Sequence, residues 1–401
     1  MKMNPELLQQ WLNWCRSESH AAILLSNNYP DPNGNYEAMF GIGAKQVFED
    51  PNQLEDFEGL AFGHISYQYK KNWPFVDQTF QKESDVPDFA FFEPQYSFLL
   101  HRDGVVHEQG IRPSENTSPE LGAQEFIPPF IASTNKTQYL QKIEEIREHI
   151  RQGVFYEMNY CIDFHVDAFI DPYELFYHLN SLAPSPFAAF YKLGNQFLLC
   201  ASPERFLLKN EQTLVSQPIK GTRKRIIGKE AETIEELRTH EKDRAENTMI
   251  VDLVRNDLSQ VCKVGTVKVP EWCEIYTFSH VHQMISTVVG EIKSGVTFND
   301  ILKATFPMGS MTGAPKIEVM KHIDRLENFS RGWYSGSIGY MNHGQFDLNV
   351  IIRSLEYHQG KLSYRVGGAI TFDSIPEEEY EECMTKAAAM VALIEKMNQL
   401  S

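Results

Sequence analysis

The chain alternates hydrophobic and polar positions with two different periods, which predicts a mixture of strands and helices. Alternating or short apolar runs predict strands over residues 59–69, 96–106, 154–166, 197–208 and 213–219. Residues 344–357 and 361–372 flank the turn His358-Gln359-Gly360 and predict a β-hairpin. Apolar residues three or four positions apart predict helices over residues 140–150, 242–258 and 377–397, the first of them closed by Gly153.

The order of these elements favours the α+β class. Strand pairs and long helices follow one another without regular βαβ alternation, which predicts a two-subdomain sheet sandwich with outer helices rather than a doubly wound sheet. A boundary is expected within residues 112–137, where four prolines stand among Ser, Asn and Gly. We therefore expect an N-terminal subdomain over residues 1–130 and a second region over residues 131–401, packed as one compact unit.

Composition excludes several classes of partner. The 401 residues carry a formal net charge of −17, which argues against nucleic acid and against an anionic membrane surface. None of the six cysteines forms a C-x-x-C pair, so neither a zinc site nor a redox motif is expected. No signal peptide and no apolar stretch of membrane-spanning length is recognised. We expect a cytoplasmic protein.

One lysine is the first candidate for chemistry. Lys220 stands between a strand and a glycine turn in Pro218-Ile219-Lys220-Gly221, and Glu204 precedes it in Ala201-Ser202-Pro203-Glu204. An amine is a nucleophile only when it is neutral, so a catalytic lysine needs burial or a proton acceptor. The alternative is an ordinary solvated lysine beside a turn.

Carboxylates on two helices suggest a metal site. Glu246 lies on the apolar face of the predicted helix 242–258, while Glu379, Glu382 and Lys386 share one face of the last helix. Acidic side chains from two helices are what Mg²⁺ needs, with water and substrate oxygen filling its other positions. The same acidic run is also typical of a solvated first turn that the helix dipole favours.

Two glycine-containing runs suggest anion binding. In Gly309-Ser310-Met311-Thr312-Gly313-Ala314-Pro315-Lys316, glycines and hydroxyls precede a helix and could form an anion cradle, although such a run is also a common helix start. The glycines in Tyr364-Arg365-Val366-Gly367-Gly368 suggest a bulge or a close backbone approach to a ligand. Arg353 on the partner strand could bind a carboxylate with two hydrogen bonds, or be an ordinary strand-face arginine.

Taken together and in this order, these segments resemble the chorismate-utilising enzymes over about residues 137–394, with a weaker match at Ala21-Ala22-Ile23-Leu24-Leu25-Ser26. The resemblance implies that family's fold, with residues 131–401 as the chorismate-binding catalytic region. The run Gly309 to Lys316 resembles the ammonia-using branch. Anthranilate synthases carry Pro-Ile-Ala-Gly-Thr where this chain has Pro-Ile-Lys-Gly-Thr, and the lysine form implies amination of chorismate at C4 to 4-amino-4-deoxychorismate, for p-aminobenzoate and folate.

The resemblance also implies roles for the candidate residues. Lys220 attacks C2 while the C4 hydroxyl leaves with a proton from Glu204, and ammonia then adds at C4 and expels the lysine. Burial and a metal ion are expected to lower the pKa of Lys220, against the attraction of Glu204. The remaining side chains are expected to hold Mg²⁺ (Glu246 and Glu382, with Glu379 close by) or the substrate (Arg353, Thr312, Lys386, Tyr364 and the amides near Gly367 and Gly368).

Two differences between this chain and its relatives bear on the identity and source of the nucleophile. Water-adding relatives carry a basic lysine near Tyr156-Glu157, where many others have Tyr-Gln; a glutamate is not such a base and could instead orient ammonium. No Gly-x-Cys-x-Gly nucleophile turn is present, so a separate glutaminase subunit is implied as the partner that supplies ammonia. Two other functions stay open: an anthranilate synthase large subunit, and a non-catalytic subunit that docks a glutaminase.

Overall fold

The computed structural model describes residues 4–76, 79, 82–113, 126–278 and 281–400. The strands are β1 (His20–Leu25), β2 (Tyr36–Phe48), β3 (Leu60–Ile65), β4 (Phe89–His101), β5 (Val106–Gln109), β6 (Ile131–Ala132), β7 (Glu157–Asp167), β8 (Phe187–Leu193), β9 (Gln196–Ser202), β10 (Arg205–Asn210), β11 (Thr213–Gln217), β12 (Ile219–Lys224), β13 (Lys268–Thr277), β14 (Val281–Glu291), β15 (Gly313–Ala314), β16 (Ser337–Asn342), β17 (Gln345–Asn349), β18 (Ser354–His358) and β19 (Lys361–Ile370). The α-helices are α1 (Pro5–Cys15), α2 (Lys136–Arg151), α3 (Pro172–Leu182), α4 (Glu230–Thr239), α5 (Glu241–Val261), α6 (Phe298–Thr305), α7 (Lys316–Leu326) and α8 (Pro376–Leu400).

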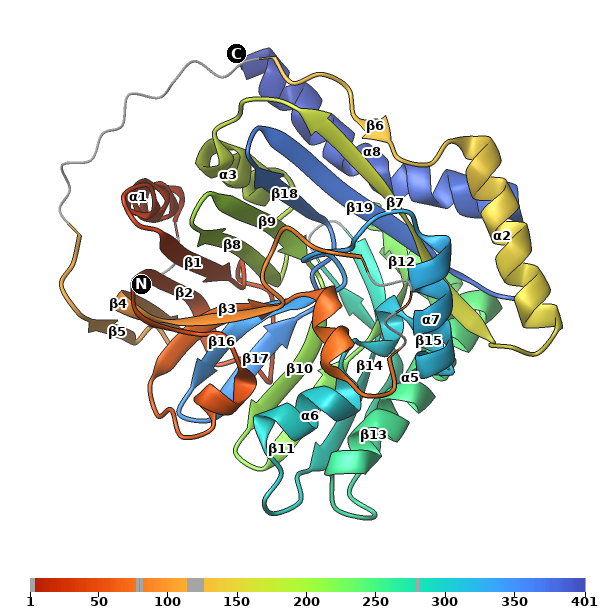
Figure 1. Cartoon of the computed structure of the whole chain (residues 1–401), viewed down its shortest axis with the longest axis horizontal. Helices are drawn as coiled ribbons and strands as arrows, with labels where there is room; N and C mark the ends of the chain where they lie inside the picture. The colour runs from red at the N-terminus through yellow and green to blue at the C-terminus, as the bar shows by residue number, and fades with distance from the viewer. Residues whose placement is uncertain (1–3, 77–78, 80–81, 114–125, 279–280, 401) are drawn as a thin grey trace.

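Antiparallel pairing joins the strands into two packed layers (Figure 1). The first layer has the order β7-β19-β18-β9-β8-β1-β2. The second has the order β3-β16-β17-β10-β11-β14-β13, and β4 joins the layers because it pairs with both β2 and β3. The α+β class and the sheet sandwich predicted from the sequence are confirmed.

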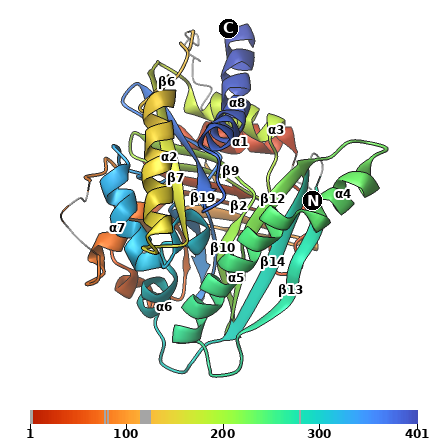
Figure 2. The same ribbon diagram turned by 90° about the vertical axis from the view of Figure 1, so that its right-hand side faces the viewer.

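Helices cover the outer faces of both layers. In β1, Ala21, Ile23 and Leu25 belong to the core beneath α1, α3 and α8, whereas Ala22 belongs to the core between the sheets. This alternation follows from the two-residue period of a strand, and the apolar residues on both faces show that the strand is covered on both sides. Figure 1 shows α8 along the outer side of β18 and β19, and Figure 2 shows α5 along β12, β13 and β14.

The expected boundary near residue 130 does not separate two sheets. β1 pairs with β8 over six positions and β3 pairs with β16 over six positions, so strands from the first 130 residues lie inside both layers. Residues 1–130 and 131–401 therefore share one hydrogen-bonded framework. Within the linker expected over residues 112–137, positions 114–125 lie outside the described residues.

Several predicted elements differ in their bounds. The helix predicted around residues 140–150 is α2, which begins with a capping box of Asn135 and Gln138 and is followed by Gly153 at φ 74°. The strand predicted over 96–106 ends at His101, and β5 begins after a turn. The strand predicted over 59–69 ends at Ile65 and continues as the 3₁₀ helix Tyr67–Asn72.

Two predicted strands are each broken at the same place in the fold. Residues 197–208 form β9 and β10 with a break at Pro203 and Glu204, and the first half of the predicted hairpin forms β17 and β18 with a break at residues 350–353. β9 and β18 pair in the first layer, whereas β10 and β17 pair in the second. Two neighbouring strands thus cross from one sheet to the other together.

No helix in the described part of the chain is both long enough and apolar enough to cross a membrane.

Candidate active site

The crossover between the layers brings together an acidic residue, Glu204, and a cationic residue, Arg353. The Val350 N–H donates to the carbonyl oxygen of Glu204 (3.0 Å), and the Ala201 N–H donates to that of Arg353 (3.0 Å), so the two residues leave the ladders side by side. Arg353 adopts φ 51°, a left-handed conformation that is unusual for an arginine and marks the bend. Burial raises the pKa of the Glu204 carboxyl, and the positive charge of Arg353 is among the effects that oppose this rise, so the two side chains lie near one another.

A bulge directs Lys220 toward the same place. The pairing of β12 with β14 shifts register between Ile219 and Thr222, and Gly221 between them has φ 87°. A side chain at Gly221 would also meet Leu237 at 2.9 Å and Asp243 at 3.0 Å, so only glycine fits this bend. The Lys220 side chain is 11% exposed, and its Nζ lies 3.4 Å from Oε1 of Glu157 on β7.

The structure changes the expectation for the protonation of Lys220. Burial opposes the charged form, but the attraction of Glu157, Glu246 and Glu204 outweighs it and raises the pKa of the lysine. The predicted lowering included the charge of a metal ion as well as burial, so it stays a prediction. Among the protein's own groups, the three carboxylates favour the ammonium form of Lys220, which must lose a proton before it can attack.

Glu204 has the properties of a proton donor. It is 5% exposed, and burial raises the pKa of its carboxyl from 4.5 to about 7, against a hydrogen bond from Ser310 and the charge of Lys220. A carboxyl with a pKa near 7 can both hold and release a proton at neutral pH. The predicted pair of Lys220 and Glu204 is thus assembled, although Glu157 is the carboxylate in direct contact with the lysine.

The three predicted metal ligands surround a lysine. Lys242 on α5 places its Nζ 3.2 Å from Glu379 Oε1 and 4.0 Å from Glu246 Oε1. Burial, together with the charges of Glu157 and Glu382, raises the pKa of Glu246 to about 7, against the lowering effect of Lys220 and Lys242. Burial would raise the pKa of Glu382 as well, but Lys386, Lys242 and Lys220 lower it on balance.

The carboxylate oxygens of these side chains are of the type that Mg²⁺ prefers. Among the described residues, no three His, Cys, Asp or Glu side chains lie close enough together to hold a metal as they stand. Oxygen donors from two helices nevertheless face one cation, the Lys242 ammonium, whose place a divalent ion could take.

The predicted glycine strand lies against this carboxylate group. A side chain at Gly368 would approach Glu379 Oε2 at 3.4 Å and Glu382 Oε1 at 4.0 Å. Lys386 donates to the Gly367 carbonyl oxygen (2.9 Å) and pairs with Glu382 (2.7 Å), which fixes α8 against β19. A side chain at Gly367 would meet Cys161 Sγ at 2.5 Å, so the close strand approach that the glycines indicated is present.

Arg353 carries the charge best suited to a substrate carboxylate. The residue is exposed, and its guanidinium makes no hydrogen bond or ion pair with the residues that the structure describes. Partial desolvation lowers the pKa of the guanidinium, against the attraction of Glu204 and Tyr29. A guanidinium without an ionic partner can bind a carboxylate with two hydrogen bonds.

One predicted substrate contact, Tyr364, is not brought to this place, and the hydroxyl of another, Thr312, is occupied within its own turn. The Tyr364 ring stacks on Phe164 (4.9 Å between centroids) and meets Phe130 edge-on, in the core beneath the helices and about 13 Å along the strand from Gly368. The Thr312 hydroxyl is fully buried and donates to the Met308 carbonyl oxygen (3.0 Å), so it holds its own turn. Ser310 is the residue of that run that reaches Glu204.

Two residues of the site, Lys242 and Ser310, were not selected from the sequence, whereas Glu157 was noted as a departure from the family pattern that could orient ammonium. Ser310 lies inside a run already selected, where only the fold distinguishes it from Thr312. Lys242 is exposed along about half of its side chain and had no signal.

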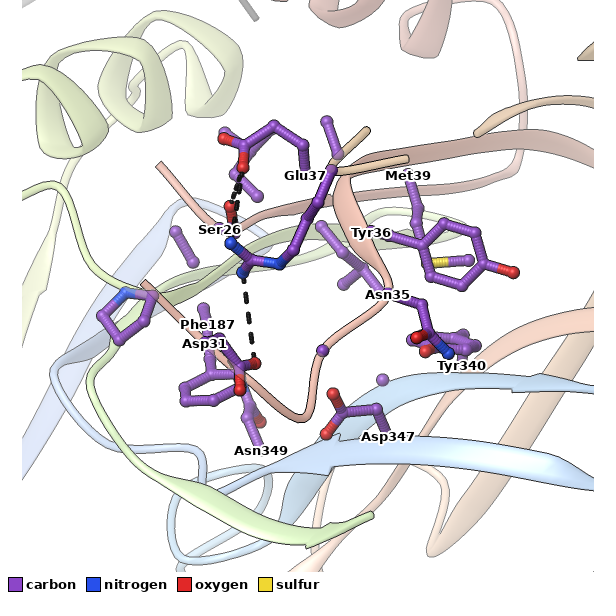
Figure 3. Close-up of a pocket in the computed structure, with 18 of the residues that line it drawn as sticks. Ser26, Asp31, Asn35, Tyr36, Glu37, Met39, Phe187, Tyr340, Asp347 and Asn349 are labelled. Atoms are coloured by element: carbon purple, nitrogen blue, oxygen red, sulfur yellow. Dashed lines mark hydrogen bonds and ion pairs between the residues drawn. The ribbon is translucent and has the colours of Figure 1, made fainter. Parts of the chain in front are cut away.

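A second, separate cavity lies between β1, β2 and β16, and Ser26, Asp31, Glu37 and Asp347 are among the polar side chains that line it (Figure 3). Ser26 donates to Glu37 (2.5 Å), and Arg205 pairs with Asp31 (2.5 Å) and Asp347 (2.8 Å). Arg205 is 1% exposed and joins the loop before β2 to β17. None of the residues selected for chemistry lines this cavity.

Comparisons with known proteins agree on one family. The description of the chorismate binding enzyme family matches residues 28–392. The chain is 41% identical over 379 residues to the chloroplastic aminodeoxychorismate synthase of Arabidopsis thaliana, a match that covers 84% of this chain but 41% of that protein, so the chain spans less than half of the plant relative. It is 33% identical over 362 residues to aminodeoxychorismate synthase component 1 of Escherichia coli, covering 86% of this chain and 80% of that protein. The crystal structure of anthranilate synthase component I from Streptococcus pneumoniae matches with a TM-score of 0.75 and 25% identity, over 92% of this chain and 89% of that one.

Proposed function

The chain belongs to the chorismate-binding enzymes, and we propose that it aminates chorismate with ammonia to give 4-amino-4-deoxychorismate, the precursor of p-aminobenzoate for folate synthesis. The observation that carries the proposal is Lys220, held in the site between Glu157 and Glu204. A lysine at this point supplies a covalent nucleophile, which direct addition of ammonia at C2 would not need. Two relatives that match most of this chain bear the name aminodeoxychorismate synthase.

The first step moves a proton and forms a bond. Lys220 passes a proton to the Glu204 carboxylate, whose pKa of about 7 allows it to accept one. The neutral amine attacks C2 of chorismate, the two conjugated ring double bonds shift, and the C4–oxygen bond breaks. Glu204 returns the proton to the departing hydroxyl, which leaves as water and makes a poor leaving group acceptable.

The second step reverses the displacement. Ammonia attacks C4, the double bonds shift back, and the bond between C2 and the Lys220 nitrogen breaks. The product carries its new amine on the carbon that lost oxygen, and the lysine is released unchanged. A chain without this amine would complete only the addition at C2, as expected for the anthranilate branch.

The charged groups around Lys220 suit the two carboxylates of chorismate. Arg353 would bind one of them, and Lys386 lies beside the carboxylate group on α8. Glu246 and Glu382, with Glu379, would hold Mg²⁺, which would neutralise substrate charge and help the C4 oxygen to depart. Because Thr312 and Tyr364 are occupied in packing, we no longer assign them substrate contacts.

The proposal includes a partner and a location. A separate glutaminase subunit would supply ammonia, in keeping with the component 1 name of the bacterial relative. The six cysteines are all buried and unpaired, which suits the expected cytoplasmic location.

Product analysis tests the proposed function. The purified chain with chorismate, Mg²⁺ and an ammonium salt is expected to form 4-amino-4-deoxychorismate, detected by mass spectrometry, and glutamine without a partner is expected to be inactive. Anthranilate as the product, visible by its fluorescence, would instead support the anthranilate synthase assignment. Absence of turnover by the folded chain would support the non-catalytic docking role.

A further inference from the structure

The Ser310 hydroxyl has no role in the two displacement steps, yet it contacts the proton donor. Ser310 is 7% exposed and Glu204 is 5% exposed, and both line one small cavity beside α5. The hydroxyl donates a hydrogen bond to the Glu204 carboxyl group. This contact joins the run Gly309 to Lys316, which was selected from the sequence for anion binding, to the acid of the site.

A closed turn holds Ser310 in place. The residue lies in the 3₁₀ turn Gly309–Met311, which the Thr312 hydroxyl closes by donating to the Met308 carbonyl oxygen (3.0 Å). The Asn159 side chain donates to the carbonyl oxygen of Ser310 itself (3.4 Å), which ties the turn to β7. The backbone that carries the Ser310 hydroxyl is therefore fixed by the fold.

Two hydrogen-bond donors and two cations act on the Glu204 carboxyl. The Ile219 N–H, next to Lys220, donates to it alongside Ser310. Burial raises the pKa of Glu204 to about 7, and these hydrogen bonds and the charges of Lys220 and Arg353 oppose the rise. The other charged residues that line the same cavity are Arg205, which is paired with Asp31 and Asp347, and Asp257 on α5, which is paired with Lys316. A hydrogen bond to the ionised form of an acid stabilises that form, so Ser310 counteracts part of the effect of burial.

The proposed mechanism needs Glu204 in both protonation states. The carboxylate must first accept a proton from Lys220, and the carboxylic acid must then give that proton to the departing hydroxyl. Burial alone would leave Glu204 protonated at neutral pH, and it could not then accept the lysine proton. A donor aimed at the carboxylate keeps the accepting form available.

We propose that Ser310 is a positioning residue for the acid, because its hydroxyl holds the Glu204 carboxylate ready to take the proton of Lys220. This role rests on the proposed function, in which Glu204 carries that proton. The hydroxyl occupies one lone pair of the carboxylate, so the incoming proton must go to another, and the same contact orients the plane of the carboxyl group. The role also accounts for the glycine-containing run, whose turn presents the hydroxyl.

The pH dependence of kcat/KM for chorismate tests this role, with free ammonia held saturating at every pH. The value rises with pH as Glu204 loses its proton and becomes able to accept another. Ser310→Ala removes a donor to the carboxylate, so the pKa of Glu204 rises, and the rising limb is expected about one pH unit higher than in wild type. Ser310→Thr retains a hydroxyl and is expected to keep the limb at the wild-type position.

Two comparisons make the shift specific to Glu204. Ser216→Ala removes a hydroxyl that lines the same cavity but donates to the Phe206 carbonyl oxygen (2.8 Å), so its limb is expected to stay in place. Glu246 also has a pKa of about 7, and its titration is common to all the variants, so only the difference between variants is assigned to Glu204.

Urea unfolding supplies a second measurement that needs no activity. Between about pH 5.5 and about pH 8, Ser310→Ala is expected to lose more stability than wild type, because a higher pKa in the folded state makes ionised Glu204 costlier. The double variant Ser310→Ala/Glu204→Gln is expected to show no such extra loss relative to Glu204→Gln. If Ser310→Ala does not fold, Ser310→Cys keeps the size with a weaker donor and is expected to shift the limb in the same direction.

The outcomes separate this role from the proposed function. A wild-type chain that forms no 4-amino-4-deoxychorismate at saturating ammonium would overturn the function, whereas the unfolding comparison would still report the contact between Ser310 and Glu204. A Ser310→Ala chain whose limb and pH-dependent stability both match wild type would overturn the positioning role alone, even if its rate falls.

Discussion

Glu204→Gln is expected to inactivate the protein and, at alkaline pH, to stabilise it. Glutamine imitates the protonated carboxyl, so it cannot donate a proton to the leaving hydroxyl. It also avoids the cost of a buried charge, because burial raises the pKa of Glu204 from 4.5 to about 7. Stabilisation with loss of activity is the combination expected where a side chain is kept for chemistry.

The magnitude follows from the two pKa values. The folded state favours protonated Glu204. The contribution of this group to the free energy of unfolding is therefore greatest below pH 4.5 and is lost as the pH rises toward about 7. Each pKa unit corresponds to about 1.4 kcal/mol, which gives a cost of about 1.4 kcal/mol at pH 5.5 and about 3.4 kcal/mol at pH 8. Glu204→Gln removes this cost, and its stabilising effect should therefore be about 2 kcal/mol larger at pH 8 than at pH 5.5.

Urea unfolding of wild type and variant at the two pH values measures this difference. Glu378→Gln, at an exposed position, serves as the matched control and should show no pH-dependent gain. A gain that is equal at both pH values would refute the reasoning, as would destabilisation at pH 8. Either result would mean that the Glu204 carboxylate is well solvated or well paired in the folded state.

Three further predictions concern other charged groups. Arg205→Met leaves Asp31 and Asp347 buried without their cation and should cost about 3–5 kcal/mol in chemical unfolding, whereas Arg102→Met, whose distances to acidic side chains are 3.8 and 4.0 Å, should cost about 1 kcal/mol or less. Lys242→Gln removes the cation between Glu379 and Glu246 and should tighten Mg²⁺ binding roughly three- to tenfold by calorimetry; weaker binding would count against a metal at these carboxylates. Arg353→Gln should raise the KM for chorismate roughly thirtyfold, corresponding to about 2 kcal/mol, and an unchanged KM would remove Arg353 from the substrate contacts.

Helices could be predicted from the spacing of their apolar and acidic residues and from the residues at their ends. The regular apolar positions of α2 and the glycine after its end predicted this helix over residues 140–150, whereas its start at Lys136 is set by a capping box that the prediction did not use. The acidic face of α8 and Glu246 on α5 were also recognised, because helical spacing alone places residues on a face.

The breaks that build the site could not be predicted in the same way. Pro203 gave a signal, since proline interrupts a central strand, but residues 350–353 contain neither glycine nor proline. Arg353 adopts its φ of 51° because two paired strands change sheets together, which is a property of the tertiary structure. The contact of Glu157 with Lys220 similarly requires the pairing of β7 with β15 and the bulge in β12.

Tyr364 shows an error that the period of the strand could have prevented. Leu362, Tyr364 and Val366 share one face of β19, and all three belong to the core beneath the helices. The motif surrounding Tyr364 suggested a ligand contact, but its own apolar neighbours on that face indicated packing.

The central claim is that Lys220 is the covalent nucleophile, and the product formed by Lys220→Ala tests it most directly. The variant, incubated with chorismate, Mg²⁺ and saturating ammonium, is analysed by mass spectrometry beside wild type and beside Lys224→Ala, an exposed position of the same strand. The account predicts that Lys220→Ala loses most formation of 4-amino-4-deoxychorismate, retaining at most slow addition of ammonia at C2, while Lys224→Ala is unaffected. Formation of 4-amino-4-deoxychorismate by folded Lys220→Ala at the wild-type rate would contradict it.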